Sequence, residues 1–242
     1  MISSAQFNKI RRKTLGDLLI PLGYVENGAD YVLQRNHQIF CIDFQKSKYG
    51  GEFAINLCFQ YDFVPSYHDF IIKEACKFKQ EDFCLWCRLD QLTQFKDFHS
   101  YGDSDAECRN KLIQLSNASV EILDECTLRW SSPEVFLKML PPELIHERVE
   151  WVRYIETCEL TAETRMQIYK ERFSGLEPGV LKFLNTWGWS IVRIIVLLIY
   201  SALHVGNRPL ALEYVNEGML LDPRHAPMKS DLLKLSSTLK GA

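Results

Sequence analysis

The sequence predicts an α+β protein, in which an N-terminal antiparallel β-sheet with flanking helices is followed by an all-α region. Three observations predict this class. Apolar and polar residues alternate through residues 39–45 and 53–61, as they do in strands that bury one face. Apolar residues recur at helical spacing before these strands, and again throughout the chain after Pro142. Finally, 242 residues with 47% hydrophobic composition suffice for a core in one or two domains.

The first predicted element is a helix that Ser3 or Ser4 caps, because serine accepts hydrogen bonds from the first free amides of a helix. Proline and glycine at positions 21 and 23 end it. The apolar residues at helical spacing are Phe7, Ile10, Leu15, Leu18 and Leu19. We expect this helix, residues 4–19, to cover a sheet.

An antiparallel meander is predicted over residues 31–62. Asn36-His37 forms one turn, and glycines 50 and 51 form the next, because glycine permits the positive φ of a tight hairpin. The alternation places Phe40, Ile42 and Phe44 on one face and Cys41, Asp43 and Gln45 on the other. We expect the buried face of the longest strand to carry Phe53, Ile55, Leu57 and Phe59. A further strand is predicted over residues 83–89.

Helices dominate the rest of the chain. Ser104 and Glu107 form a capping box that begins one helix, and Pro133 suits the first position of a short helix. Pro141-Pro142 is the predicted boundary between an α+β domain of residues 1–140 and a helical domain of residues 141–242. Later helices are predicted at 143–159, 162–174, 179–205, 209–221 and 227–240. The third of these is apolar nearly all round, which indicates a central helix.

Composition and charge limit which cell compartments and which classes of partner are compatible with this chain. The N-terminus lacks the apolar run of a signal peptide, and the longest apolar stretch, 194–199, is too short to cross a bilayer. We therefore expect a cytoplasmic protein that does not bind membranes, with its eight cysteines as reduced core thiols. Residues 1–50 carry seven basic and four acidic side chains, and residues 51–140 carry nine basic and fifteen acidic. The acidic middle argues against nucleic acid and favours a basic partner, although a merely solvated acidic surface gives the same count.

The sequence predicts no catalytic residue, no metal site and no cofactor. Cys84 and Cys87 have the CxxC spacing, but positions i and i+3 of a strand point to opposite faces, and no second pair of metal ligands follows. His146-Glu147 begins a zinc-protease pattern that lacks its second histidine. A site of His68, His99 and a carboxylate that assembles only in the folded chain leaves a hydrolase or metalloenzyme as an alternative.

Two segments resemble known families. The run from Gly206 to Pro223 resembles the second half of a tetratricopeptide repeat, with Gly206, Ala211, Gly218 and Pro223 at the characteristic positions. Residues 3–140 resemble a bacterial family known as domain of unknown function 4304. The segments that carry this second resemblance are Leu19-Ile20-Pro21-Leu22-Gly23-Tyr24, Gln45-Lys46-Ser47-Lys48-Tyr49-Gly50, Phe53-Ala54-Ile55-Asn56-Leu57, Arg88-Leu89-Asp90-Gln91-Leu92 and Trp130-Ser131-Ser132-Pro133-Glu134 with Leu137 and Leu140. Phenylalanines stand at 95 and 98, where members often carry tryptophan.

The second resemblance implies a non-enzymatic immunity protein, which binds a cognate secreted toxin and blocks it by occlusion. The partner would be a protein toxin, for example a basic nuclease. The candidate binding residues are the aromatic side chains of Tyr49, Tyr61 and Trp86 with the acidic side chains of Asp62 and Glu52. A tetratricopeptide-like adaptor that binds a peptide in the helical region is the alternative.

Two further segments have both a binding interpretation and a structural one. Residues 45–50 form either a binding loop or a hairpin turn with solvated lysines. The run Trp187-Gly188-Trp189 forms either a partner surface or a packing contact between helices.

Overall fold

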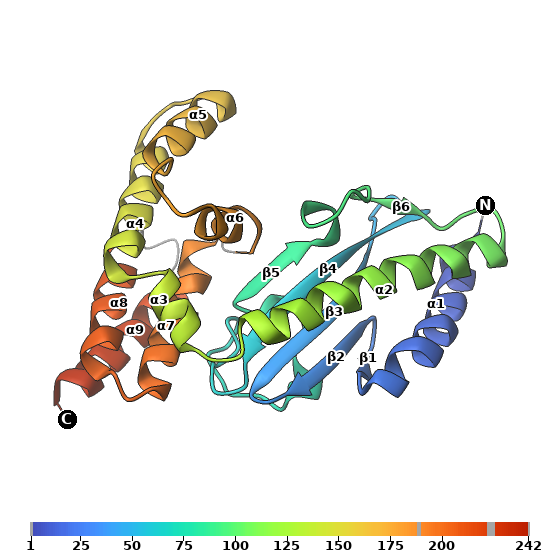
Figure 1. Ribbon diagram of the computed structural model, residues 1–242, viewed down its shortest axis with the longest axis horizontal. Coiled ribbons are helices and arrows are strands. Elements are labelled where there is room, and N and C mark those ends of the chain that lie inside the picture. The colour runs from blue at the N-terminus through green and yellow to red at the C-terminus, as the bar shows by residue number, and fades with distance from the viewer. Residues whose placement is uncertain (1, 188–189, 222–225, 242) are drawn as a thin grey trace. The chain divides into compact units, whose positions relative to one another are not determined.

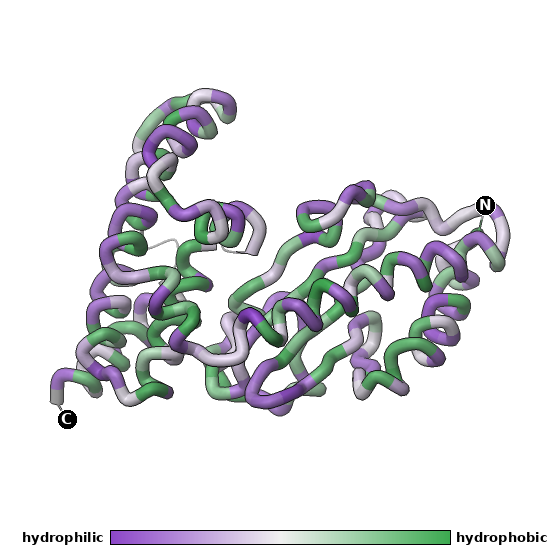
Figure 2. The backbone as a smooth tube through the Cα atoms, viewed as in Figure 1, coloured by the Kyte–Doolittle hydropathy of each residue, from purple (hydrophilic) through white to green (hydrophobic). Residues whose placement is uncertain are grey.

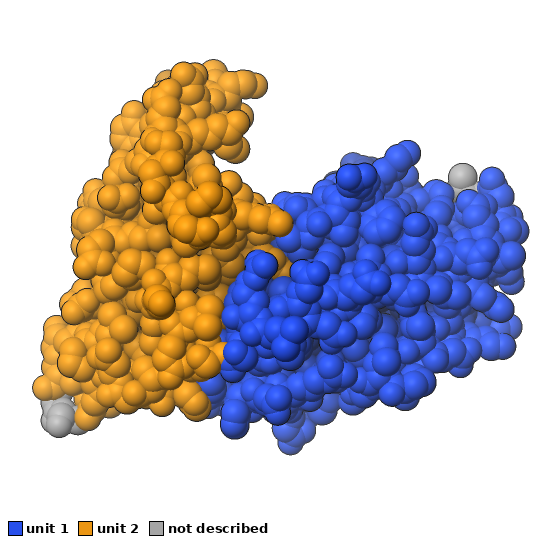
Figure 3. Space-filling view, viewed as in Figure 1, with its two compact units in different colours: residues 1–131 blue, residues 132–242 orange. Residues whose placement is uncertain are grey.

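The chain forms two compact units, Met1–Ser131 and Ser132–Ala242, which Figure 3 distinguishes by colour. The structure is a computed structural model that describes residues 2–187, 190–221 and 226–241. Unit 1 contains the sheet and unit 2 is helical, so the α+β class predicted from the sequence is confirmed.

Unit 1 is an antiparallel sheet with two long helices. Its helices are α1 (Ser4–Leu19) and α2 (Asp105–Arg129), with short 3-10 turns at Ile20–Leu22, Ala75–Lys77, Gln80–Asp82 and Leu89–Gln91. Its strands are β1 (Val25–Asn27), β2 (Asp30–Arg35), β3 (Gln38–Lys46), β4 (Glu52–Tyr61), β5 (Leu85–Arg88) and β6 (His99–Ser100). The strand order is β1-β2-β3-β4-β5, and β6 pairs with the beginning of β4.

Local signals position the first elements as predicted. Ser3 caps α1 by accepting a hydrogen bond from the amide of Gln6 at 3.2 Å. Asn36 and His37 both have positive φ, as a two-residue hairpin between β2 and β3 requires. Ser104 caps α2 as predicted, but the Glu107 carboxylate accepts from the amide of Asp103 and not from that of Ser104, so the second bond of the predicted capping box is displaced by one residue.

Helices α1 and α2 lie on the same side of the sheet (Figure 1), over the face that the alternation predicts to be buried. Phe53, Ile55, Leu57 and Phe59 are each at most 2% exposed. The Phe7 ring of α1 lies 5.0 Å from that of Phe53, which confirms the packing of α1 on the meander.

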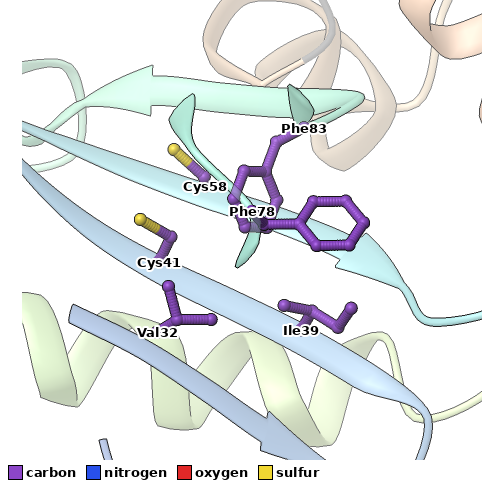
Figure 4. Packing of buried hydrophobic residues seen from close by; sticks show 6 residues of the cluster. All are labelled: Val32, Ile39, Cys41, Cys58, Phe78 and Phe83. Carbon is purple, nitrogen blue, oxygen red and sulfur yellow. The ribbon is translucent and has the colours of Figure 1, made fainter. Parts of the chain in front are cut away.

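The second face of the sheet is also buried, which differs from the half-exposed sheet that the alternation predicts. Residues 63–84 cover it, and their Phe78 and Phe83 pack against Val32, Cys41 and Cys58 with Ile39 (Figure 4). The polar residues of this face are therefore inside the protein. Asn56 donates to the Asp43 carboxylate at 2.6 Å, and Gln60 donates to the carbonyl of Val64 at 2.8 Å. Hydrogen bonds of this kind offset the cost of burying polar groups.

Unit 2 consists of helices. They are α3 (Glu134–Met139), α4 (Pro142–Thr157), α5 (Ala162–Arg172), α6 (Pro178–Thr186), α7 (Ile191–His204), α8 (Arg208–Leu220) and α9 (Ala226–Gly241). Helix α7 is buried along nearly its whole length, as its apolar composition predicts, and Figure 2 shows its hydrophobic character. No single helix among the described residues is long and apolar enough to cross a bilayer, and α6 with α7 has that length and composition only as a bent pair.

The two units divide at Ser131, before the predicted boundary at Pro141-Pro142, because α3 packs within unit 2. The Phe136 ring of α3 lies 5.7 Å from that of Phe183 in α6. The hydroxyl of Tyr214 in α8 donates to the carbonyl of Leu140 at 2.8 Å.

The single helix predicted over residues 179–205 is wrong, because the structure has two helices there, α6 and α7. Ser190, a residue of modest helix preference, is the N-cap of α7, and its side chain makes no cap hydrogen bond.

Small residues allow the last helices to approach closely. Gly206 ends α7 with a φ of +77°. A Cβ at Gly218 of α8 would lie 2.7 Å from Leu232 Cδ1 in α9 and 3.3 Å from Ile195 Cγ2 in α7. A side chain at position 218 would therefore prevent α8 from lying this close to α7 and α9. Pro223, which carries part of the tetratricopeptide resemblance, lies outside the described residues.

Candidate partner-binding surface

The hairpin between β3 and β4 presents an exposed aromatic side chain on an ordered turn. Ser47 organises this turn, because its amide donates to the carbonyl of Glu52 at 2.9 Å and its carbonyl accepts from Gly50 at 3.0 Å. Gly50 and Gly51 have φ of +77° and +74°, which glycine adopts without strain. Tyr49 is 87% exposed, and the Lys48 ammonium lies 5.0 Å from the centre of its ring. The hairpin therefore holds a cation and an aromatic ring toward solvent.

A hollow of about 460 Å³ lies beside this hairpin and is called the tip hollow below. It is lined by Gln45, Lys46, Ser47, Lys48, Tyr49, Glu52 and Phe98. The predicted binding residues Tyr49 and Glu52 thus lie at one place. A half-exposed Phe98 from a distant part of the sequence joins them, because β6 pairs with the start of β4.

Arg88 fixes the far side of the tip hollow. Its guanidinium lies 4.9 Å from the centre of the Phe98 ring and forms an ion pair with Asp97. Its Nη2 donates to the Gln45 side-chain oxygen at 3.2 Å. The Phe98 ring is consequently positioned by contacts from β3 and β5 before any partner binds.

The other predicted binding residues lie elsewhere. The prediction that Tyr61 is an exposed anchor is wrong, because this residue is 1% exposed and its hydroxyl donates to the carbonyl of Trp130 at 2.9 Å. Trp86 is half-buried on the second face of the sheet, where it packs against the Phe78–Phe83 cluster. Asp62 follows β4 at the end opposite Glu52 and accepts from Gln34 at 3.0 Å and contacts His37 Nδ1 at 3.2 Å. The five predicted residues therefore do not form one site.

A second hollow, of about 760 Å³, lies between α1 and the β-sheet and is called the basic hollow below. It is lined by Asn8, Lys9, Arg11, Arg12, Lys13, Ala29, Phe44 and Lys46. No acidic side chain occurs among these lining residues. Five cations thus border one cavity of ligand size.

The two arginines of the basic hollow are held by the protein itself. Arg11 is 7% exposed, and its Nη1 donates to the carbonyl of Ala29 at 2.6 Å. Arg12 pairs with Glu26 at 2.8 Å, and this hydrogen bond raises the pKa of Arg12 above its ordinary value. Lys9, Lys13 and Lys46 form no ion pair within the described part of the chain.

The cysteines and histidines that the structure describes form no recognisable chemical centre. Strand pairing sets Cys87 opposite Leu57 and Trp86 opposite Cys58, so Cys87 faces the helices while Trp86 faces the other side. Burial raises the pKa of the Cys87 thiol, which disfavours the thiolate that redox chemistry and metal binding need. Within residues 2–187, 190–221 and 226–241, no three His, Cys, Asp or Glu side chains lie close enough to hold a metal ion.

Of the run Trp187-Gly188-Trp189, Trp187 is buried at the end of α6, and positions 188 and 189 lie outside the described residues.

The basic hollow and the contribution of Phe98 were not predicted from the sequence. Two features of the sequence point to the basic hollow: the run Lys9-Ile10-Arg11-Arg12-Lys13 and the excess of basic residues in positions 1–50. Neither shows that Lys46, which is more than thirty residues away in the chain, lies beside this helix. Only the folded meander brings them together.

Comparison with known proteins adds one finding to this geometry. No curated protein and no solved structure matches the chain. One protein-family model matches a segment of this chain. That segment begins within α1 and ends at Trp130, so it includes the whole sheet and α2. Residues 15–130 thus match the family described as Domain of unknown function (DUF4304), which identifies most of unit 1 as similar to that family.

Proposed function

We propose that this chain is an immunity protein, which binds one cognate protein toxin through unit 1 and blocks it by occlusion. The observation that carries the proposal is the exposure of Tyr49 on an ordered hairpin beside Phe98. Tyrosine and other aromatic residues, together with arginine, dominate the energetics of protein interfaces. A partner that covers this hairpin buries an aromatic ring that now contacts water.

The contacts of the tip hollow support binding of a specific partner. Turn hydrogen bonds hold the backbone on which Tyr49 stands, and Arg88 positions the Phe98 ring, so the Phe98 side chain needs little reordering on association. Each rotamer-rich side chain that is already ordered saves about 0.5–1.5 kcal/mol on binding. The tip hollow is accordingly suited to an anchor contact.

The test uses the toxin-domain protein encoded beside this gene. The intact chain and its Tyr49→Ala variant are each titrated against that protein by calorimetry, and each is co-expressed with it in a growth-protection assay. We expect Tyr49→Ala to weaken binding by about 2 kcal/mol, or roughly thirtyfold, as truncation of an interface anchor does. Phe98→Ala should weaken it in the same direction.

Leu128→Ala is the matched control, because Leu128 is 81% exposed on α2 and lies outside the tip hollow. It should leave affinity and protection unchanged. If the intact chain binds no product of a neighbouring gene, or if Tyr49→Ala binds as well as Leu128→Ala does, the proposal is wrong.

A further inference from the structure

We propose that the basic hollow binds an acidic segment of the partner protein, with glutamate or aspartate side chains seated against Lys9, Lys13 and Lys46. This inference rests on the proposed function and extends it by assigning the charge of the partner at this site. It reverses the prediction of a basic toxin, which follows from counting charges along residues 51–140.

The three lysines are the cations of the basic hollow that remain available. Arg11 donates to the backbone at Ala29 and Arg12 pairs with Glu26, whereas the lysines have no ion pair among the described residues. Lys9 and Lys13 stand one helical turn apart on α1, where like charges repel each other. An anionic ligand relieves that repulsion, and this favours carboxylates over neutral groups.

Several acidic side chains of residues 51–140 already have a cation beside them. Asp69 and Asp82 share Lys73, Asp97 pairs with Arg88, and Asp124 pairs with Arg35. These four carboxylates are therefore partly neutralised within the protein. The basic hollow, in contrast, presents one sign of charge at one place, which is what steers an association.

The basic hollow and the tip hollow adjoin each other, because Lys46 lines both. A partner that covers Tyr49 is thereby brought next to Lys46 and the lysines of α1. Lys9 and Lys13 also line the other flank of α1, but that flank is less one-sided in charge, since Asp105 lies there with Arg109 and accepts from Gln6 at 2.6 Å. The sheet side of α1 is accordingly the side that we expect to contact the acidic segment of the partner.

The lining favours an acidic protein segment over nucleic acid. Single-stranded nucleic acid binds through aromatic platforms on which its bases stack. The aromatic residue of the basic hollow is Phe44, which is 2% exposed and therefore offers no ring face. Carboxylates on a peptide need only the lysine ammonium groups.

The test measures anion binding by the intact chain without any toxin. A fluorescein-labelled octaglutamate peptide is titrated by anisotropy at low and at physiological salt, beside a labelled eight-nucleotide oligothymidine. We expect octaglutamate to bind more tightly than the oligonucleotide and to weaken with salt. Reversing the three charges, Lys9→Glu with Lys13→Glu and Lys46→Glu, should weaken it by about tenfold or more.

The matched control reverses three exposed lysines of unit 2, Lys138→Glu with Lys170→Glu and Lys182→Glu, and so changes the net charge by the same amount. It should bind octaglutamate within about twofold of the original chain. Circular dichroism verifies that both variants are folded, and the single variant Lys46→Glu replaces the triple variant if the latter unfolds.

Three results would overturn the inference. They are no binding of octaglutamate, equal loss in the two triple variants, and tighter binding of the oligonucleotide than of octaglutamate. Failure of the proposed function is distinguishable, because it shows as no toxin binding by the intact chain or as unchanged toxin binding in Tyr49→Ala, whereas this test contains no toxin. A chain that binds octaglutamate through these lysines but no toxin would retain the acidic-segment site and lose the immunity role.

Discussion

Two carboxylic acids face each other at the edge of the buried second face of the sheet. Asp30 on β2 and Asp43 on β3 are 8% and 9% exposed. Burial, followed by the hydrogen bond with Asp43 and the charge of Asp43, raises the pKa of Asp30 to about 8, although Arg11 acts in the opposite direction. The pair thus holds one proton at neutral pH, since two adjacent buried carboxylates cannot both ionise without a large cost.

This pair predicts a stability that falls as pH rises. The folded-state pKa of Asp30 lies above its unfolded value, so the folded chain binds the proton more tightly. The stabilisation is complete below about pH 4 and is lost progressively up to about pH 8, by at most about 1.4 kcal/mol per pH unit. We expect Asp30→Asn, which keeps a hydrogen-bond donor to Asp43, to flatten this slope and to be about 1–2 kcal/mol more stable than the original chain at pH 8.

Urea unfolding at pH 5, 6.5 and 8 measures this difference. Asp17→Asn is the control, because Asp17 is exposed on α1. Parallel stability curves for the Asp30→Asn variant and the original chain would contradict the shared proton.

At the scale of elements, the segment of residues 63–84 decides whether the sheet has a second core. Its only helices are short 3-10 turns, and hydrogen bonds with side chains hold its backbone in place. Asp82 is the centre of these contacts, since its carboxylate accepts from Ser66 Oγ at 2.5 Å, Lys73 Nζ at 2.7 Å and the Lys79 amide at 2.9 Å. Burial alone would raise the pKa of Asp82, but the hydrogen bonds from Lys73 and Ser66 outweigh it and lower that pKa.

We therefore predict that Asp82→Ala destabilises unit 1 by about 2–4 kcal/mol, because Ser66 and Lys73 lose their shared acceptor inside the protein. Glu74→Ala on the same segment should cost less than about 0.5 kcal/mol, since the pair of Glu74 with Lys77 is mostly in water. The contribution of Asp82 is present above its unfolded pKa and disappears as pH falls through the lower folded pKa. The difference between Asp82→Ala and the original chain should thus shrink toward pH 3.

Urea unfolding gives both values, and hydrogen exchange shows whether residues 63–84 open first in the Asp82→Ala variant. Equal stability of the Asp82→Ala and Glu74→Ala variants would mean that the carboxylate does not fasten this segment.

At the scale of the molecule, α3 is assigned to unit 2 by its packing and not by its position before the two prolines. Phe136 is fully buried against Phe183, and Tyr214 donates to the carbonyl of Leu140. A fragment that begins at residue 141 lacks both the Phe136 ring and the Leu140 carbonyl.

We predict that the fragment 132–242 is more stable than the fragment 141–242. Removing a buried phenylalanine costs about 3–5 kcal/mol, and the orphaned Tyr214 hydroxyl adds about 1 kcal/mol or more. Thermal unfolding followed by circular dichroism compares the two fragments. Phe136→Ala within the longer fragment should reproduce most of the loss. Equal midpoints for the two fragments would place α3 outside the core of unit 2.

The short strands β1 and β6 are not predicted from the sequence, whereas the α+β class, the strands β2 to β5, the two turns that join β2, β3 and β4, and the serine caps of α1 and α2 are. Each of these depends on residues that are close in the chain. Ser3 and Ser104 cap the helices that follow them, and Asn36-His37 turns between adjacent strands. The face occupied by Phe53 and its alternating neighbours follows from the pleat of one strand.

Only the folded chain shows which of the remaining side chains contact water. Nothing described covers Tyr49, whereas Tyr61, which continues the alternation of the buried strand residues, lies under Trp130. Cys41, Asp43 and Asn56 alternate as if exposed and are buried by residues 63–84, which have no periodic pattern. Lys46 meets Lys9 and Lys13 only because the meander returns β3 to the side of α1. Burial and charge clustering depend on contacts between segments far apart in the chain, and local patterns carry no information about such contacts.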